Sequence, residues 1–213
     1  RKENRLLNGH PWIYKTEIDR IEGDFTDGDI VDFQDHRGRF LGRGYANTRS
    51  RIVARLLTTE RQTIDASFFR DRLLNAFSYR DQWVHHTNAC RAVYSESDLL
   101  PGLIVDRYGD YLVVQFLTLG MDRWKEAVID ILEDHFHPKG IIERSDTPIR
   151  RHEGLSSVKS VLRGDCPELI DIQEYDRSYL VDVMNGQKTG FFLDQRENRQ
   201  VVAALANGAR VLD

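Results

Sequence analysis

Short runs near the beginning of the chain alternate apolar and polar positions, which is the pattern of half-buried β-strands. Residues 30–33 and 39–45 are predicted to form two strands joined by a turn at residues 35–38. Over residues 51–56, arginines and apolar side chains alternate, so a third strand is expected to carry them largely on opposite faces. Residues 1–62 are therefore predicted to form a small β module.

The next part of the chain has the spacing of apolar residues that is typical of a helix. Apolar and aromatic side chains recur near every third or fourth position over residues 64–83, and Asp65 is a suitable N-cap. We expect residues 63–88 to act as a linker helix between the β module and a central unit. The aromatic side chains of this helix are expected to belong to the core.

The central unit, residues 89–175, is predicted to pack strands on a helix as an α+β domain. Residues 103–107 and 111–116 have the pattern of a hairpin. Asp122 is expected to cap a helix with one apolar side, which ends before Gly140, and residues 141–143 form a further strand. Nothing in this unit resembles a catalytic constellation.

The last part of the chain, residues 176–213, begins with an alternating strand over residues 178–184. A helix is expected from Asp194 to Gly208, because Asp194 and Glu197 have the spacing of a capping box. Its buried face is predicted to consist of Val201, Val202 and Leu205. The final five residues are predicted to start a buried strand, so the chain is expected to break off as a further domain begins.

Composition narrows the class of protein. A hydrophobic fraction of 40% and a charged fraction of 30% are ordinary for a soluble globular chain. No apolar run approaches the roughly 20 residues that cross a bilayer, and no membrane partner is expected. Cys90 and Cys166 lie far apart, which argues against a disulfide framework and favours the cytoplasm. The histidines have no further ligands at a metal-site spacing, so no metal is expected.

The net charge of −4 does not suggest nucleic-acid binding, but the distribution of charge does. Acidic residues crowd positions 22–35, and no acid interrupts the arginines that follow between residues 37 and 55. Phe40 and Tyr45 lie among them. A cationic stripe with aromatic residues is the footprint expected for a phosphate backbone. A solvated strand face explains the same pattern, and both interpretations stay open. The stripe consists of Arg37, Arg39, Arg43, Arg49, Arg51 and Arg55.

The chemistry of residues 186–196, called the signature segment below, points to an anionic or polar ligand. The helix that follows offers free backbone N–H groups at its N-terminus. Arg196 in its first turn can pair with a carboxylate, and Gln195 can hydrogen-bond a polar group. Lys188 and Thr189 come just before Gly190, which permits close approach of the backbone to a ligand. A well-capped structural helix explains the segment equally well.

The signature segment, GQKTGFFLDQR, resembles the sequence before the S-adenosylmethionine domain in the bacterial 23S ribosomal RNA cytosine-5 methyltransferase I family. Residues 6–14, LLNGHPWIY, are similar to the opening of that family's PUA domain, a small RNA-binding β-barrel. Residues 96–109 resemble its central hairpin, and residues 144–146 and 150–154 fit the same region. These motifs occur in the family's order and extend over essentially the whole chain.

The resemblance implies a fold between α+β and α/β: a PUA-like β-barrel, a central α+β domain and the first elements of a Rossmann-like methyltransferase domain. It implies S-adenosyl-L-methionine as cofactor and ribosomal RNA as partner, while a homodimer stays open. In such enzymes a cysteine thiolate attacks carbon 6 of cytosine and carbon 5 takes the methyl group. The catalytic cysteines are expected beyond this chain, so neither Cys90 nor Cys166 is assigned as catalytic.

The resemblance and the arginine stripe together give two sets of predicted site residues. The open alternatives are an RNA-binding adaptor without methyl transfer and a methyltransferase that acts on another RNA. The predicted RNA-binding residues are Arg5, His10, Trp12, Arg43, Tyr45, Arg49 and Arg51. The predicted cofactor-binding residues are Lys188, Thr189, Gly190, Phe191, Gln195, Arg196 and Asp213.

Overall fold

The structure is a computed structural model and describes residues 4–206 and 208–210. Its N-terminal module contains α1 (Asn4–Leu7), β1 (Trp12–Tyr14), the 3-10 helix η1 (Lys15–Glu17), β2 (Ile30–Gln34), β3 (Phe40–Ala46) and β4 (Ile52–Thr58). The strands form one antiparallel sheet in the order β1-β4-β3-β2. Three of them confirm the strands that the period of two predicts, at residues 30–33, 39–45 and 51–56.

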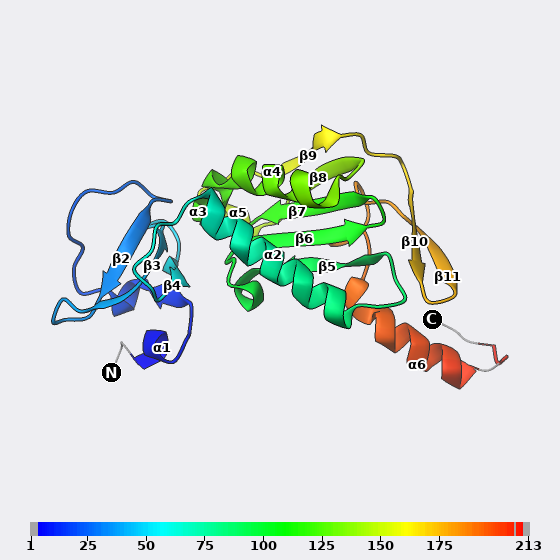
Figure 1. Ribbon diagram of the computed structural model, residues 1–213, viewed down its shortest axis with the longest axis horizontal. Helices are drawn as coiled ribbons and strands as arrows, with labels where there is room; N and C mark the ends of the chain where they lie inside the picture. Colours follow the sequence, from blue (N-terminus) through cyan, green and yellow to red (C-terminus); the bar gives the residue numbers. More distant parts are fainter. Residues whose placement is uncertain (1–3, 207, 211–213) are drawn as a thin grey trace.

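The central part is a five-stranded sheet covered by helices (Figure 1). Its strand order is β5-β6-β7-β8-β9, and only the pair β7–β8 is parallel. The parallel pair requires a crossover, which two consecutive helices supply. The elements are α2 (Ala66–Trp83), β5 (Ala89–Tyr94), η2 (Ser95–Asp98), β6 (Leu103–Tyr108), β7 (Tyr111–Phe116), α3 (Leu119–Arg123), α4 (Lys125–Phe136), β8 (Gly140–Ser145), α5 (Ile149–His152) and β9 (Val158–Gly164).

The helix predicted over residues 64–83 and the predicted hairpin are confirmed, and Asp65 caps α2 by accepting a hydrogen bond from the backbone N–H of Phe68. The predicted cap at Asp122 is wrong. The crossover begins earlier, where the side chain of Thr118 caps α3 by accepting from the N–H of Met121. Asp122 lies inside α3, and its carboxylate pairs instead with Arg150, which is buried.

Two apolar clusters lie on opposite faces of the sheet. Leu112 and Val114 of β7 pack with α2 and α4 in the larger cluster, whereas Val113 belongs to the smaller one. The alternation along β7 follows from the period of a strand. The smaller cluster is closed by the hairpin of β10 (Ile170–Glu174) and β11 (Arg177–Val181), through Ile172 and Val181.

The chain continues from the hairpin through η3 (Leu193–Gln195) into α6 (Arg196–Ala206), which extends from the body of the molecule (Figure 1). The predicted buried face of α6 is wrong, because Leu205 is 80% exposed and both valines of that face are exposed. The contacts that hold α6 lie at its beginning, where Arg199 pairs with Glu174 at 2.5 Å. The later turns, which carry these three side chains, are exposed.

The predicted capping box is also replaced. The carboxylate of Asp194 pairs with Lys188 at 2.8 Å, and Glu197 accepts from the hydroxyl of Tyr175 at 3.1 Å. Of the predicted terminal strand, Ala209 is exposed and lies outside regular structure, as does the residue after it, and residues 211–213 lie outside the described part. Among the described residues, no helix has the length and apolar character needed to span a membrane.

Candidate nucleic-acid interface and signature segment

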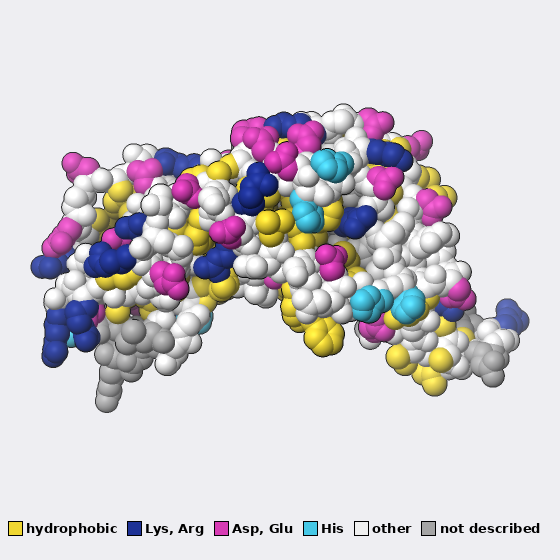
Figure 2. All heavy atoms as spheres, viewed as in Figure 1, with side chains coloured by type: hydrophobic (Ala, Val, Ile, Leu, Met, Phe, Trp, Pro, Cys, Tyr) yellow, Lys and Arg dark blue, Asp and Glu magenta, His cyan; other side chains and the backbone are white. Residues whose placement is uncertain are grey.

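An open hollow of about 620 Å³ lies on the N-terminal module, between the segment of β1 and η1 and the turn that joins β3 to β4. Arg5, Arg49 and Arg51 all line it, so three of the predicted RNA-binding residues come together although they lie far apart in sequence. Figure 2 shows Lys and Arg side chains gathered at this end of the molecule. The remaining lining residues are Tyr14, Lys15, Thr16, Glu17, Thr48 and Ser50.

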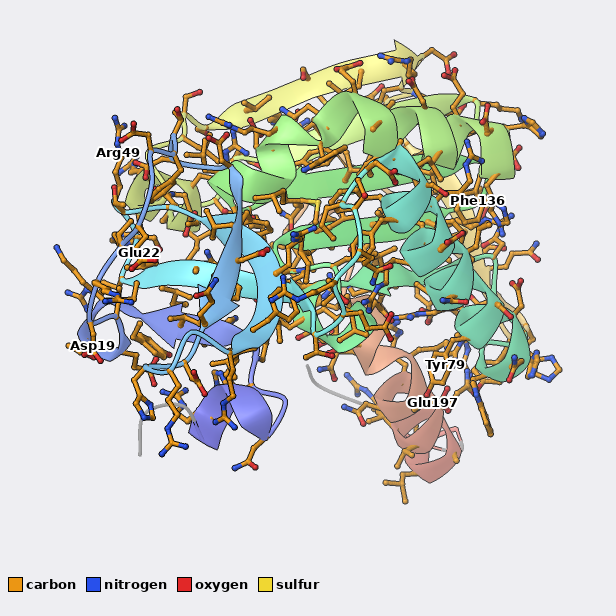
Figure 3. All side chains as sticks on the ribbon, turned by 60° about the vertical axis from the view of Figure 1, so that its left-hand side comes forward. Asp19, Glu22, Arg49, Tyr79, Phe136 and Glu197 are labelled. Carbon is orange, nitrogen blue, oxygen red and sulfur yellow. The ribbon has the colours of Figure 1, made fainter. Side chains whose placement is uncertain are left out.

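The cations of the turn between β3 and β4 are exposed. The side chain of Arg49 is 70% exposed and projects from the module (Figure 3), with its Nε 3.7 Å from the carboxylate of Asp27. Thr48 holds the same carboxylate with its hydroxyl at 2.8 Å, which fixes the turn. Arg51 is exposed as well. Both arginines can therefore reach a phosphate group without leaving a buried partner uncompensated.

Arg5, His10 and Trp12 form a connected corner beside the hollow. The guanidinium of Arg5 lies 3.0 Å from His10 Nε2 and 5.0 Å from the ring centre of Tyr14. His10 Nδ1 accepts from the backbone N–H of Trp12 at 3.2 Å. Trp12 Nε1 donates to Glu96 at 2.7 Å, so the indole also joins the module to the central part.

Two predicted RNA-binding residues are engaged by other parts of the protein, Tyr45 in the core and Arg43 nearer the surface. Tyr45 is 1% exposed, and its hydroxyl donates to the carbonyl of Pro101 at 2.6 Å. Burial raises the pKa of the Tyr45 phenol. The prediction for Tyr45 is therefore corrected, because a ring in the core cannot stack on a base. Arg43 makes two hydrogen bonds to Asp32, at 2.6 and 3.2 Å.

The arginine stripe is not a continuous cationic surface. Asp32 is the register partner of Arg43 across the β2–β3 pair, and its hydrogen bond from Arg43 lowers the pKa of the Asp32 carboxyl. Arg55 is buried and pairs with Glu153 of the central part at 3.0 Å. Acids from residues 22–35 thus pair with several arginines that follow them: Asp35 with Arg39, Asp32 with Arg43 and Asp27 with the exposed Arg49. Arg37 and Arg51 are also exposed, and of these two only Arg51 lines the hollow.

The signature segment is anchored by a buried hydroxyl. Thr189 is 1% exposed, and its Oγ1 donates to Asp106 Oδ2 at 2.5 Å and lies 2.9 Å from the hydroxyl of Tyr108. Arg91 completes the network with hydrogen bonds to both oxygens of Asp106, at 2.8 and 3.0 Å. Burial raises the pKa of Tyr108. The hydroxyl of Thr189 is therefore used inside the protein, and its contact to a cofactor stays a prediction.

The backbone of the segment is held from the other side by Arg144. Its guanidinium donates to the carbonyl of Val183 at 2.5 Å and to that of Gly186 at 3.2 Å. Gly190 has a φ of 135°, and a Cβ there would lie 3.0 Å from Val183, so glycine is required by both conformation and space. Arg144 was not expected from the sequence, because nothing local marks it as a partner of residues so much further along the chain.

The other predicted cofactor-binding residues lie at or near the surface of the segment. Lys188 Nζ is 2.8 Å from Asp194, and this hydrogen bond lowers the pKa of the Asp194 carboxyl. The ring of Phe191 packs on Tyr179, with centres 5.1 Å apart. Arg196 pairs with a neighbouring carboxylate at 3.0 Å and donates to the carbonyl of His85 at 3.4 Å.

Gln195 is exposed, and its side-chain oxygen accepts from Asn198 at 2.7 Å. Asp213 lies outside the described residues. Within residues 4–206 and 208–210, no group of three or more His, Cys, Asp or Glu side chains could hold a metal ion. Sequence reasoning missed Lys15 and Glu17 of the hollow, although both directly follow the apolar run that forms β1.

Comparison with known proteins gives consistent findings. Residues 1–59 match the family model described as a PUA-like domain. The whole chain is 40% identical over 216 residues to the ribosomal RNA large subunit methyltransferase I of Aeromonas salmonicida (strain A449), and 38% identical over 215 residues to that of Pseudoalteromonas atlantica. The chain spans about half of these relatives, 54% of their length.

Among solved structures, the fold resembles "A putative sam-dependent methyltransferase from Streptococcus mutans", with a TM-score of 0.78 and 22% identity. The match covers 94% of this chain and 51% of that chain. The predicted fold class is confirmed: the chain has a mixed α/β fold with a PUA-like N-terminal module.

Proposed function

We propose that this chain is the RNA-binding and central part of an S-adenosylmethionine-dependent methyltransferase that acts on 23S ribosomal RNA, with carbon 5 of a cytosine as the methyl acceptor. The observation that carries the proposal is identity of 38–40% along the whole chain to relatives named ribosomal RNA large subunit methyltransferase I. The cationic hollow supports it, because RNA binding needs exposed cations that are free to meet phosphates.

We propose that each predicted part of the chain has its own role. Residues 1–62 bind RNA, residues 63–88 link, residues 89–175 form the central domain and residues 176–213 begin the methyltransferase domain. The exposed apolar face of α6 supports the last assignment, since a helix with large exposed apolar side chains normally packs on a further layer. In our proposal that layer is the remainder of the methyltransferase domain.

The described part of the signature segment does not by itself fit S-adenosylmethionine. The hydroxyl of Thr189 is committed to Asp106, the ammonium of Lys188 is paired with Asp194, and Arg196 is tied to the carbonyl of His85. We therefore propose that most contacts to the cofactor come from other parts of the full-length protein. When bound, the cofactor would supply the methyl group.

Calorimetry of the 213-residue chain with S-adenosylmethionine tests this division. We expect weak or no binding, because the segment offers few uncommitted polar groups. Affinity in the low micromolar range would show that the chain holds a complete cofactor site and that the proposed division is wrong.

A further inference from the structure

The hollow contains one carboxylate among its cations. The side chain of Glu17 is only 16% exposed, and its Oε2 accepts from the backbone N–H of Tyr14 at 2.8 Å, which closes the turn of η1. Its Oε1 lies 3.6 Å from Arg5 Nη1, which is beyond hydrogen-bond distance. Because a carboxylate has about four acceptor positions, Glu17 keeps capacity to accept a hydrogen bond from a ligand.

The carboxylate of Glu17 closes the turn of η1 and lies beside Arg5, and it would also repel a phosphate placed next to it. The hollow offers two kinds of interaction at different places. Arg49 and Arg51, which are exposed, offer positive charge to phosphates, while Glu17 is more enclosed and offers an acceptor to a donor group. A ligand with both features carries phosphate and an exocyclic amino group together, as a cytidine, adenosine or guanosine nucleotide does.

The volume of the hollow is sufficient for a single nucleotide. A concavity of about 620 Å³ has room for one base with its sugar, whereas an RNA duplex is recognised through the backbone and its wide minor groove. Unpaired bases can be splayed out and stacked on aromatic rings or arginine planes. Tyr14 and Arg5 both line the hollow, and the guanidinium of Arg5 lies over the Tyr14 ring, 5.0 Å from its centre, so each covers part of the surface that the other could offer to a base.

We propose that the hollow takes one unpaired nucleotide of the RNA, with the exocyclic amino group of its base donating to Glu17 Oε1 and its phosphates held by Arg49 and Arg51. This inference rests on the proposed RNA-binding function and adds a specificity to it. Cytosine, adenine and guanine carry an exocyclic amino group and uracil does not, so an unpaired uridine should be the weakest ligand.

The test uses RNA hairpins that differ at one unpaired position: cytidine, the riboside of 2-pyrimidinone, or no unpaired residue. The 2-pyrimidinone ring is cytosine without its amino group, so the pair isolates one hydrogen bond. Binding to the 213-residue chain is measured by fluorescence anisotropy. Because a hydrogen bond to a charged acceptor is involved, we expect cytidine to bind about tenfold more tightly than 2-pyrimidinone.

The variant Glu17→Gln should abolish this preference. An amide has one acceptor oxygen, and the N–H of Tyr14 would keep it, so the NH₂ group would face the ligand. Glu22→Gln is the matched control, because Glu22 is exposed on the same module and does not line the hollow (Figure 3). The control should keep the tenfold preference.

Equal affinity of the unaltered chain for cytidine and 2-pyrimidinone would overturn the inference without any variant. A preference that survives Glu17→Gln would overturn the role of Glu17. Replacing Arg49 and Arg51 with Glu distinguishes a failure of this inference from a failure of the proposed RNA-binding function. If that change weakens RNA binding while the unaltered chain binds the two bases equally, the RNA-binding function stands and this inference fails. If that change leaves the affinity unaltered, the hollow is not the RNA site and both fail.

Discussion

Thr189 Oγ1 donates a hydrogen bond to Asp106 Oδ2 at 2.5 Å and thereby joins the signature segment to strand β6 of the central sheet. Both residues are buried, and Arg91 balances the charge of Asp106 from the neighbouring strand. A residue of the recognised motif thus has an internal, structural role. The central part of the chain therefore positions the signature segment through contacts within the protein.

Thr189→Val should destabilise the protein by about 1–3 kcal/mol, because it leaves the buried oxygen of Asp106 and the hydroxyl of Tyr108 without this partner. Urea unfolding followed by circular dichroism measures the change. Thr189→Ser keeps the hydroxyl and should recover most of the stability. Equal loss in both variants would contradict the role of the hydrogen bond, since Thr189→Ser keeps the hydroxyl.

The pair between Arg55 and Glu153 should act as a latch between the N-terminal module and the central part. Glu153→Ala leaves the buried guanidinium of Arg55 uncompensated, so we expect a loss of about 3–5 kcal/mol in the free energy of unfolding. Asp134→Ala removes the partner of Arg70 in an exposed pair and should change stability little. Similar small effects in both variants would show that the Arg55–Glu153 pair contributes no more to stability than an exposed ion pair does.

RNA binding should depend on the hollow and not on the whole arginine stripe. Replacing Arg49 and Arg51 with Glu should weaken binding and flatten its dependence on salt, because fewer counterions are released. Arg37→Glu is the control, since Arg37 belongs to the stripe but does not line the hollow. Filter binding over a range of salt concentrations decides between them. A comparable loss per charge at all three positions would favour a diffuse cationic surface.

Acid should loosen the β2–β3 turn through Asp35. Burial alone would raise the pKa of this carboxyl, but hydrogen bonds from the backbone and side chain of Arg39 and the backbone of Arg37 lower it from 3.8 to about 2. Since the folded pKa is the lower one, this stabilisation is present above about pH 3.8 and is lost as the pH falls through about 2.

Asp35→Asn should therefore reduce stability near neutral pH and flatten its dependence on pH between about 4 and 2. Asp24→Asn, at an exposed carboxylate of the same module, should leave the profile unchanged. Urea midpoints measured across that range give the comparison. Parallel profiles for Asp35→Asn and the unaltered chain would contradict the assignment.

If the exposed face of α6 packs on a further part of the protein, as we propose, stability should depend on the length of the protein. In the 213-residue chain, Leu205→Glu should shift the unfolding midpoint little, because Leu205 is 80% exposed. In the full-length protein the same change should destabilise, if this face packs on the remainder of the domain as we propose. Leu73→Ala, in the core, should cost about 2–5 kcal/mol in both. No difference between the two lengths would remove the support that α6 gives to the proposed domain.

Local patterns predicted the local structure well. The helix over residues 64–83 and its cap at Asp65 were predictable because spacing and capping act within a few residues. The partners that neutralise arginines of the stripe could not be predicted, because they come from distant parts of the chain. Asp32 pairs with Arg43 across the β2–β3 pair, and Glu153 of the central part pairs with Arg55. Single-sequence patterns do not contain those long-range partners.

The site was predictable to the same extent. Arg5, Arg49 and Arg51 were expected to bind RNA and do line one hollow, but the hollow itself depends on how β1 lies beside β4. Thr189 was expected to face a ligand because it belongs to the motif, and only the packed structure shows its hydroxyl directed to Asp106. Membership of a motif identifies a segment without separating its anchoring residues from its binding residues.

The most direct test of the central claim is mass-spectrometric mapping of modified nucleotides in 23S ribosomal RNA from cells with and without the full-length protein. The account predicts that one cytosine carries a methyl group on carbon 5 only when the protein is present, and that replacing Arg49 and Arg51 with Glu lowers its occupancy. Identical modification maps in both kinds of cell would contradict the proposed function.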